Sequence, residues 1–109
     1  MSTPVTLSTG RGADGQVVVT AIGELDMSNV DAFSQALANA LAQTDGEPVQ
    51  VDIRRVEYLD SGAINALFPH AKHLRVVANP ILMSALTISG LTQLARVETG
   101  LAPLRRDPT

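Results

Sequence analysis

The fold is decided by the stretch Val49–Leu67, which reads VQVDIRRVEYLDSGAINAL. Val49, Val51 and Ile53 alternate with polar residues, as in a strand that buries one face. From residue 63 onward the apolar residues follow helical spacing instead. The intervening Asp60-Ser61-Gly62 therefore enters a helix, where free backbone N–H groups and the positive end of the helix dipole meet.

Ser61 has two possible explanations at such a position. Aspartate and serine are usual helix-capping residues, and a cap needs no further function. A helix start also stabilises an anion, and the Ser61 hydroxyl could carry one. The stretch alone leaves both explanations open, and the rest of the chain bears on the choice.

The chain on either side alternates between strand and helix patterns. Pro69 should end or kink the helix after Ser61 close to Phe68, because proline removes a backbone hydrogen bond. Asn79 and Pro80 predict another helix start, with asparagine as the cap. This alternation predicts an α/β fold with a mostly parallel sheet. The expected strands are 5–8, 17–22, 49–53, 74–78 and 94–97, the first two antiparallel, and the expected helices begin at Ser28, Ser61 and Asn79.

Helical spacing also predicts which side chains form the core. Ser28 with Asp31 resembles a capping box, and the helix that follows carries an apolar stripe. The later helix should stop at Ser89-Gly90-Leu91, with Gly90 in the left-handed conformation. The side chains expected to face inward are Val30, Phe33, Leu37, Ala40 or Leu41, Leu82, Ala85 and Leu86.

Composition limits the class of protein. The 109 residues suit one domain, and 45% hydrophobic with 17% charged residues is ordinary for a globular protein. A net charge of −3 and 3% aromatic residues disfavour a nucleic-acid binder. The absence of cysteine excludes disulfides, thiol catalysis and cysteine metal sites. No segment resembles a membrane span or a signal peptide, so we expect a cytoplasmic protein.

The two histidines of the chain are its only candidate metal ligands of that type. His70 and His73 lie three residues apart, but the sequence offers no third ligand nearby, so we expect no metal and no cofactor. Their position after the expected helix also gives no spacing for a Ser-His-acid triad. Asp26 and Asp60 could form a carboxylate pair, yet no substrate pocket is indicated. An enzyme is therefore not expected.

Three short motifs together resemble the STAS domain of bacterial anti-sigma factor antagonists. They are Gly23-Glu24-Leu25-Asp26, Leu59-Asp60-Ser61-Gly62 and Ser89-Gly90-Leu91. The resemblance covers residues 5–98 and leaves 99–109 as a partly ordered C-terminal tail. It implies a single STAS-like domain, with a mixed four- to five-stranded sheet and helices packed on one face.

The resemblance also implies a function that is not catalytic. Such antagonists bind an anti-sigma factor, usually a serine kinase of the histidine-kinase-like ATPase superfamily, and thereby free the sigma factor. Phosphorylation breaks that complex, and a serine phosphatase restores it. By position, Ser61 matches the phosphoacceptor, Asp26 and Asp60 match acids of the switch region, and Gly62 matches a small residue beside them.

The chain departs from the family pattern at one place that bears on function. The segment from Ile64 to the next strand is shorter than in typical members and contains Pro69. This leaves an alternative open: a STAS module without phosphorylation, acting as a scaffold or as a sensor for a nucleotide or small anion near the helix start.

Overall fold

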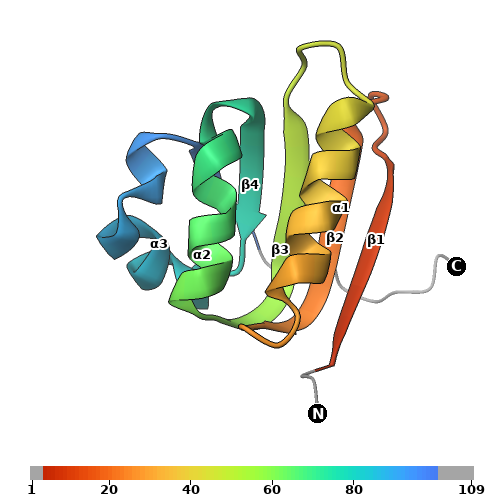
Figure 1. Ribbon diagram of the computed structural model, residues 1–109. Coiled ribbons are helices and arrows are strands. Elements are labelled where there is room, and N and C mark those ends of the chain that lie inside the picture. Colours follow the sequence, from red (N-terminus) through yellow and green to blue (C-terminus); the bar gives the residue numbers. More distant parts are fainter. Residues whose placement is uncertain (1–3, 101–109) are drawn as a thin grey trace, which may run out of the picture.

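One five-stranded sheet forms the centre of the molecule in the computed structural model, which describes residues 4–100 (Figure 1). The strand order is β1-β2-β3-β4-β5. β1 runs antiparallel to β2, and the other neighbours are parallel. The mixed sheet predicted from the sequence is therefore confirmed. The strands are β1 (Val5–Arg11), β2 (Val17–Leu25), β3 (Val49–Leu59), β4 (Leu74–Ala78) and β5 (Arg96–Thr99).

The helices cover one face of this sheet, as expected. In Figure 1, α1 and α2 lie across the sheet, and α3 lies beside α2. Asn79 caps the segment after β4, because its side-chain oxygen accepts a hydrogen bond from the Ile81 N–H. The α-helices are α1 (Val30–Ala42), α2 (Ser61–Leu67) and α3 (Met83–Ser89), and the 3-10 helices are η1 (Phe68–His73), η2 (Pro80–Leu82) and η3 (Leu91–Gln93).

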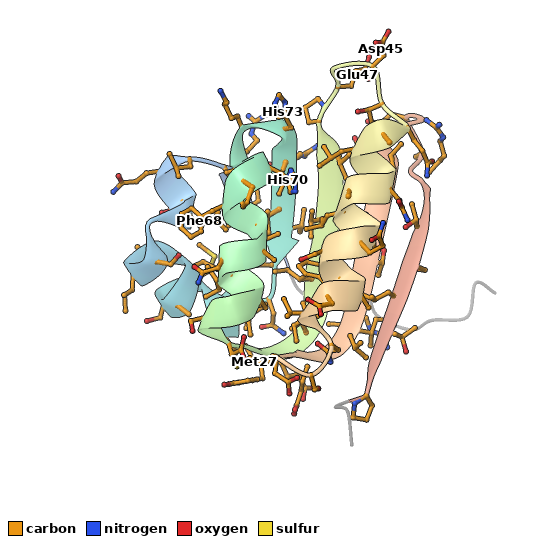
Figure 2. The ribbon with its side chains drawn as sticks, in the orientation of Figure 1. Met27, Asp45, Glu47, Phe68, His70 and His73 are labelled. Atoms are coloured by element: carbon orange, nitrogen blue, oxygen red, sulfur yellow. The ribbon has the colours of Figure 1, made fainter. Side chains whose placement is uncertain are left out.

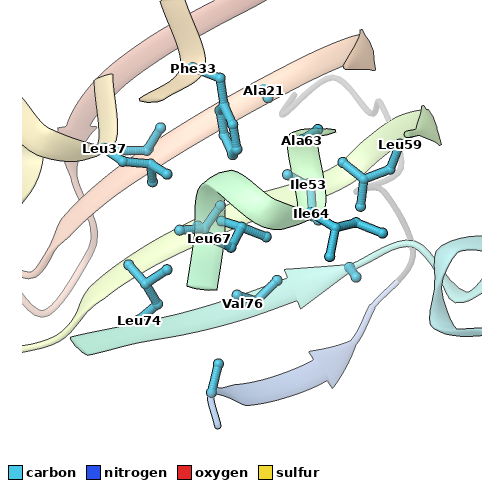
Figure 3. Packing of buried hydrophobic residues seen from close by; sticks show 14 of the residues in the cluster. Ala21, Phe33, Leu37, Ile53, Leu59, Ala63, Ile64, Leu67, Leu74 and Val76 are labelled. Carbon is cyan, nitrogen blue, oxygen red and sulfur yellow. The ribbon is translucent and has the colours of Figure 1, made fainter. Parts of the chain in front are cut away.

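The core is aliphatic except for Phe33 and lies between the sheet and the helices (Figure 3). Alternate residues of each central strand point into it, as period-two patterning requires. Phe33 and Leu37 of α1, Leu67 of α2 and Leu86 of α3 complete it and are fully buried. Burial of this kind supplies most of the stabilising free energy of a small domain.

Several local predictions are confirmed. α2 ends at Leu67 and η1 begins at Phe68, so the helix changes where Pro69 was expected to interrupt it. Gly90 has a φ of 90° and closes α3 in the left-handed conformation. The adjoining Leu91 is fully buried, as the predicted folding back of this residue requires.

Other local predictions are wrong. The cap of α1 is Asn29 and not Ser28. Ala85 of α3 is exposed, although Leu82 at the end of η2 and Leu86 of α3 are buried as expected. The last strand covers Arg96–Thr99 rather than 94–97, because Leu94 and Ala95 form the turn that follows η3, with both N–H groups donating to the Leu91 carbonyl. The predicted tail at 99–109 falls almost entirely outside the described residues.

The topology determines where polar loops gather. β2, β3 and β4 are parallel, so their carboxyl ends share one edge of the sheet. The loop after β2, the start of α2 and the start of η2 all lie at that edge, which we call the rim. Ligand and partner sites in α/β proteins are commonly found at such an edge.

Candidate functional site

Two loops from distant parts of the sequence are joined at the rim by Asp60. The backbone N–H of Asp60 donates to the Leu25 carbonyl at 3.1 Å. Oδ2 of Asp60 accepts a hydrogen bond from the Met27 N–H, also at 3.1 Å. Oδ1 accepts from the Ala63 N–H at 3.0 Å, which makes Asp60 the N-cap of α2. One carboxylate thus holds both the loop after β2 and the first turn of α2.

Asp26 organises the loop after β2 from within. Its Oδ1 accepts hydrogen bonds from the Ser28 N–H at 2.8 Å and from the Ser28 hydroxyl at 2.6 Å. Its own N–H donates to Oδ1 of Asn29, and Nδ2 of Asn29 donates to the Glu24 carbonyl. This network corrects the capping prediction, since the Ser28 hydroxyl is directed at Asp26 and the buried Asn29 occupies the cap position.

Ser61 is the first residue of α2 and is exposed. The capping hydrogen bond is accepted by Asp60, so the Ser61 side chain is not needed for that purpose. The capping role in this motif therefore belongs to Asp60, and the exposed hydroxyl belongs to Ser61. Asp60 accounts for the cap, and Ser61 presents a hydroxyl to solvent at the rim.

Gly62 lies where a larger side chain would crowd the loops. A Cβ placed on it would come within 3.3 Å of Oδ1 of Asp60 and 3.8 Å of Cγ of Met27. The first of these contacts is tight, and the atom involved is the one that caps α2. A small residue here allows Asp60 and Met27 to stay in place.

Met27 is a feature of the rim that sequence reasoning missed. Its side chain is 80% exposed although its backbone N–H is fixed by Asp60. Figure 2 shows it at the edge of the molecule where the β2 loop and α2 meet. The only signal in the sequence was an apolar residue between Asp26 and Ser28. The rim thus offers an exposed apolar side chain beside two carboxylates and a serine hydroxyl.

The two histidines lie far from this rim, at the opposite end of the parallel strands (Figure 2). His70 and His73 line a hollow of about 390 Å³, with Leu41 and Glu47 on its other walls. The sequence offered no third metal ligand close to the two histidines, whereas the fold brings the Glu47 carboxylate to the same hollow. Among residues 4–100, however, no three His, Cys, Asp or Glu side chains are positioned to hold a metal ion.

The face of the sheet opposite the helices carries a close ion pair between two residues of β3. Nη2 of Arg54 lies 2.8 Å from Oδ2 of Asp52, and Nε of Arg54 donates to Oδ1 of Asp52 at 2.9 Å. Burial raises the pKa of Asp52, but hydrogen bonds from Arg54 and the charges of Arg54 and Arg55 outweigh it, so this pKa lies below its ordinary value. The pair stabilises the bulged part of β3 rather than the rim.

Within the described part of the chain, no helix has both the length and the apolar character needed to cross a lipid bilayer.

Comparisons with known proteins agree with the fold. The family described as "Mlab, STAS domain" matches residues 9–102. A crystal structure of an anti-sigma factor antagonist from Mycobacterium paratuberculosis is similar, with 26% identity, a TM-score of 0.76 and 90% of each chain covered. No protein among the curated sequences matches the chain significantly.

Two further structures are similar in fold alone. The anti-sigma factor antagonist SpoIIAA in its unphosphorylated form is 16% identical, with a TM-score of 0.68 over 87% of this chain and 88% of its own. A protein with a SpoIIAA-like fold from Shewanella loihica is 17% identical, with a TM-score of 0.59 over 90% of this chain and 86% of its own.

Proposed function

This chain belongs to the STAS domain family, and we propose that it acts as an anti-sigma factor antagonist whose partner is a kinase-type anti-sigma factor. Support comes from the Mycobacterium paratuberculosis antagonist, which is similar over 90% of both chains. It also comes from the rim, whose exposed Met27 and flanking polar groups suit a protein surface better than a small substrate.

The regulatory part of the proposal rests on the different roles of Asp60 and Ser61 at the start of α2. Asp60 makes the capping hydrogen bond, while Ser61 is exposed beside it. A kinase can reach such a hydroxyl without unfolding the helix. Ser61 is therefore the proposed phosphoacceptor, and Asp26, Asp60 and Gly62 form the proposed switch region around it.

Phosphorylation would act on the partner interface through charge. A phosphoserine carries a charge of about −1.5 to −2 at neutral pH. Asp26 and Asp60 already make this part of the rim acidic, so the new charge would join two negative charges that lie there. Burying the charge in an interface would require desolvating it, which transient complexes rarely offset. The modified form would then release its partner, and a serine phosphatase would restore binding.

The proposal assigns no catalytic step, cofactor or nucleic acid to this chain. It places the protein in the cytoplasm, where sigma factors and their regulators act. The same rim supports one alternative function, a STAS scaffold or a sensor for a nucleotide or small anion that is not phosphorylated. The short α2, with η1 starting at Phe68, favours this alternative because part of the typical partner surface is reduced.

An affinity capture from the source cell tests the proposal. Wild-type and Ser61→Asp baits are compared, and a protein with a histidine-kinase-like ATPase domain should be recovered with the wild type and depleted with the variant. The purified kinase should then phosphorylate the wild type and leave Ser61→Ala unmodified. Equal recovery by both baits, or phosphorylation of Ser61→Ala, would favour the scaffold or sensor.

A further inference from the structure

The face of the sheet opposite the helices, which we call the open face, keeps part of its apolar surface accessible. Alternate residues of β2 point to this face and are only half-buried, namely Val18, Thr20 and Ile22. Val77 of β4 does the same between two buried neighbours. The helices of the described chain lie on the other side of the sheet (Figure 1). The described elements therefore leave this face incompletely covered.

A hollow of about 300 Å³ opens on this face where β2 and β3 approach the rim. Ile22 contributes an apolar side chain to one wall, and Arg54 and Arg55 contribute to the other. The stems of arginine side chains are aliphatic, so they pack against apolar groups while the guanidinium stays hydrated. Arg54 is paired with Asp52, and Arg55 shares the hollow with Glu57. An uncharged segment in the hollow would therefore meet balanced charges.

The described chain ends at Gly100, which lies against the open face beside this hollow. Its N–H donates to the Ala78 carbonyl at 2.9 Å, which continues the pairing of β5 with β4. A Cβ placed on Gly100 would come within 3.1 Å of Cδ of Arg54 and 3.2 Å of Cγ1 of Val77. Both contacts are closer than ordinary van der Waals contact. The absence of a side chain thus lets the backbone leave β5 pressed against the sheet, next to a residue that lines the hollow.

We propose that the segment that follows, Leu101–Leu104, docks on the open face and fills this hollow. Its sequence, Leu-Ala-Pro-Leu, contains no charge and no residue larger than leucine. Proline keeps the residue before it extended, and an extended polyproline II segment has three residues per turn. Leu101 and Leu104 would then share one side of the segment and bury their apolar surface against the sheet.

The reach of the segment fits the width of the sheet. Neighbouring strands lie about 4.8 Å apart, so β4 and β2 are separated by about 10 Å. Four residues of polyproline II span about 12 Å. Leu101 would lie at the hollow beside Arg54, and Leu104 would reach Ile22 on β2. Ser61 and Met27 do not line the hollow, so the proposal goes beyond anti-sigma factor binding and does not depend on it.

Paramagnetic relaxation in the full chain tests the proposal. The chain has no cysteine, so Arg105→Cys gives a single site for a nitroxide label directly after Leu104. The amide NMR signals of Thr20 and Ile22 should lose most of their intensity, because the docked segment brings the label over β2. The signal of Ala38 on α1 should keep most of its intensity, since the sheet separates α1 from the label.

Leu104→Ser in the labelled chain should restore most of the lost intensity. Ala102→Ser is the matched control and should leave the loss unchanged, because residue 102 would face away from the sheet. The proposal is overturned if Leu104→Ser restores nothing, if Ile22 and Ala38 lose equal intensity, or if only residues beside Gly100, such as Val77, lose any. It is also overturned if spin-labelled chains cause the same loss in isotope-labelled chains that carry no nitroxide, since a second copy then covers the face.

Discussion

Met27 and Asp60 are joined by a hydrogen bond across 33 positions of sequence, from the Met27 N–H to Oδ2 of Asp60 at 3.1 Å. The other oxygen of Asp60 caps α2. One side chain therefore connects the exposed apolar residue of the rim to the helix that begins with Ser61. A partner that contacted Met27 and a modification of Ser61 would therefore act on two segments that are joined through Asp60.

Replacing Asp60 tests this connection. Asp60→Ala removes the cap and the bond to Met27, and the free energy of unfolding should fall by about 2 kcal/mol. Asp60→Asn keeps one acceptor oxygen and should lose about half as much. Urea denaturation measures both, and Asp45→Ala in an exposed loop is the control. Equal losses for Asp60→Ala and Asp45→Ala would show that the two loops are held by other contacts.

The ion pair on β3 predicts a dependence on pH. Because the pKa of Asp52 is lowered in the folded state, its charge contributes stability above the unfolded pKa that is lost as pH falls through the folded pKa. Asp52→Asn should therefore reduce the free energy of unfolding by about 1–2 kcal/mol near neutral pH. The difference from wild type should shrink below about pH 4.

Urea denaturation at about pH 7, 5 and 3 measures this difference. Asp45→Asn is the matched control and should change the free energy of unfolding by less than about 0.5 kcal/mol at each pH. A difference between wild type and Asp52→Asn that is the same at all three values would mean that Asp52 does not act through its charge.

Core truncations have a large expected effect. Leu37 and Leu86 are fully buried, so Leu37→Ala and Leu86→Ala should each lower the free energy of unfolding by about 2–5 kcal/mol. Leu94 is 57% exposed, and Leu94→Ala should cost well under half as much. Thermal melts rank the three variants, and a larger loss for Leu94→Ala would contradict the core described above. Arg105 and Arg106, which the sequence predicts to be dispensable for stability, lie outside the described residues.

The sequence predicted the architecture because its patterns are strong and local. The alternation at Val49, Val51 and Ile53 and the stop at Gly90 each follow from backbone geometry that few other conformations satisfy. Asp26 and Asp60 follow β2 and β3, and the parallel order that the sequence predicts for the sheet brings the ends of these two strands to one edge. The core positions Leu37 and Leu86 followed from helical periodicity.

The predictions that failed depend on contacts between segments or on small shifts of helical phase. Ser28 satisfied a capping pattern, but the structure uses its hydroxyl for Asp26 and buries Asn29 instead. Ala85 was expected inside, yet the 3-10 turn before α3 and the packing of Leu82 and Leu86 leave it outside. The exposure of Met27 could not be predicted, because it depends on how two loops meet.

The last prediction concerns Ser61. Ser61→Asp places a negative charge at an exposed position where a helix begins, which a folded helix tolerates well. Its melting temperature should therefore stay close to that of the wild type. Its affinity for the kinase-type anti-sigma factor should fall by at least about tenfold, because the new charge joins Asp26 and Asp60 at the proposed interface. Ser61→Ala should bind as the wild type does and should resist release in the presence of ATP.

Calorimetric titration of the three forms measures the affinities, and Ser8→Asp adds the same charge to the exposed edge strand β1 as a control. Only a charge at Ser61 should weaken binding. If Ser61→Asp binds as tightly as Ser8→Asp and the wild type, Ser61 is not the switch, and the rim binds its partner irrespective of charge at that position.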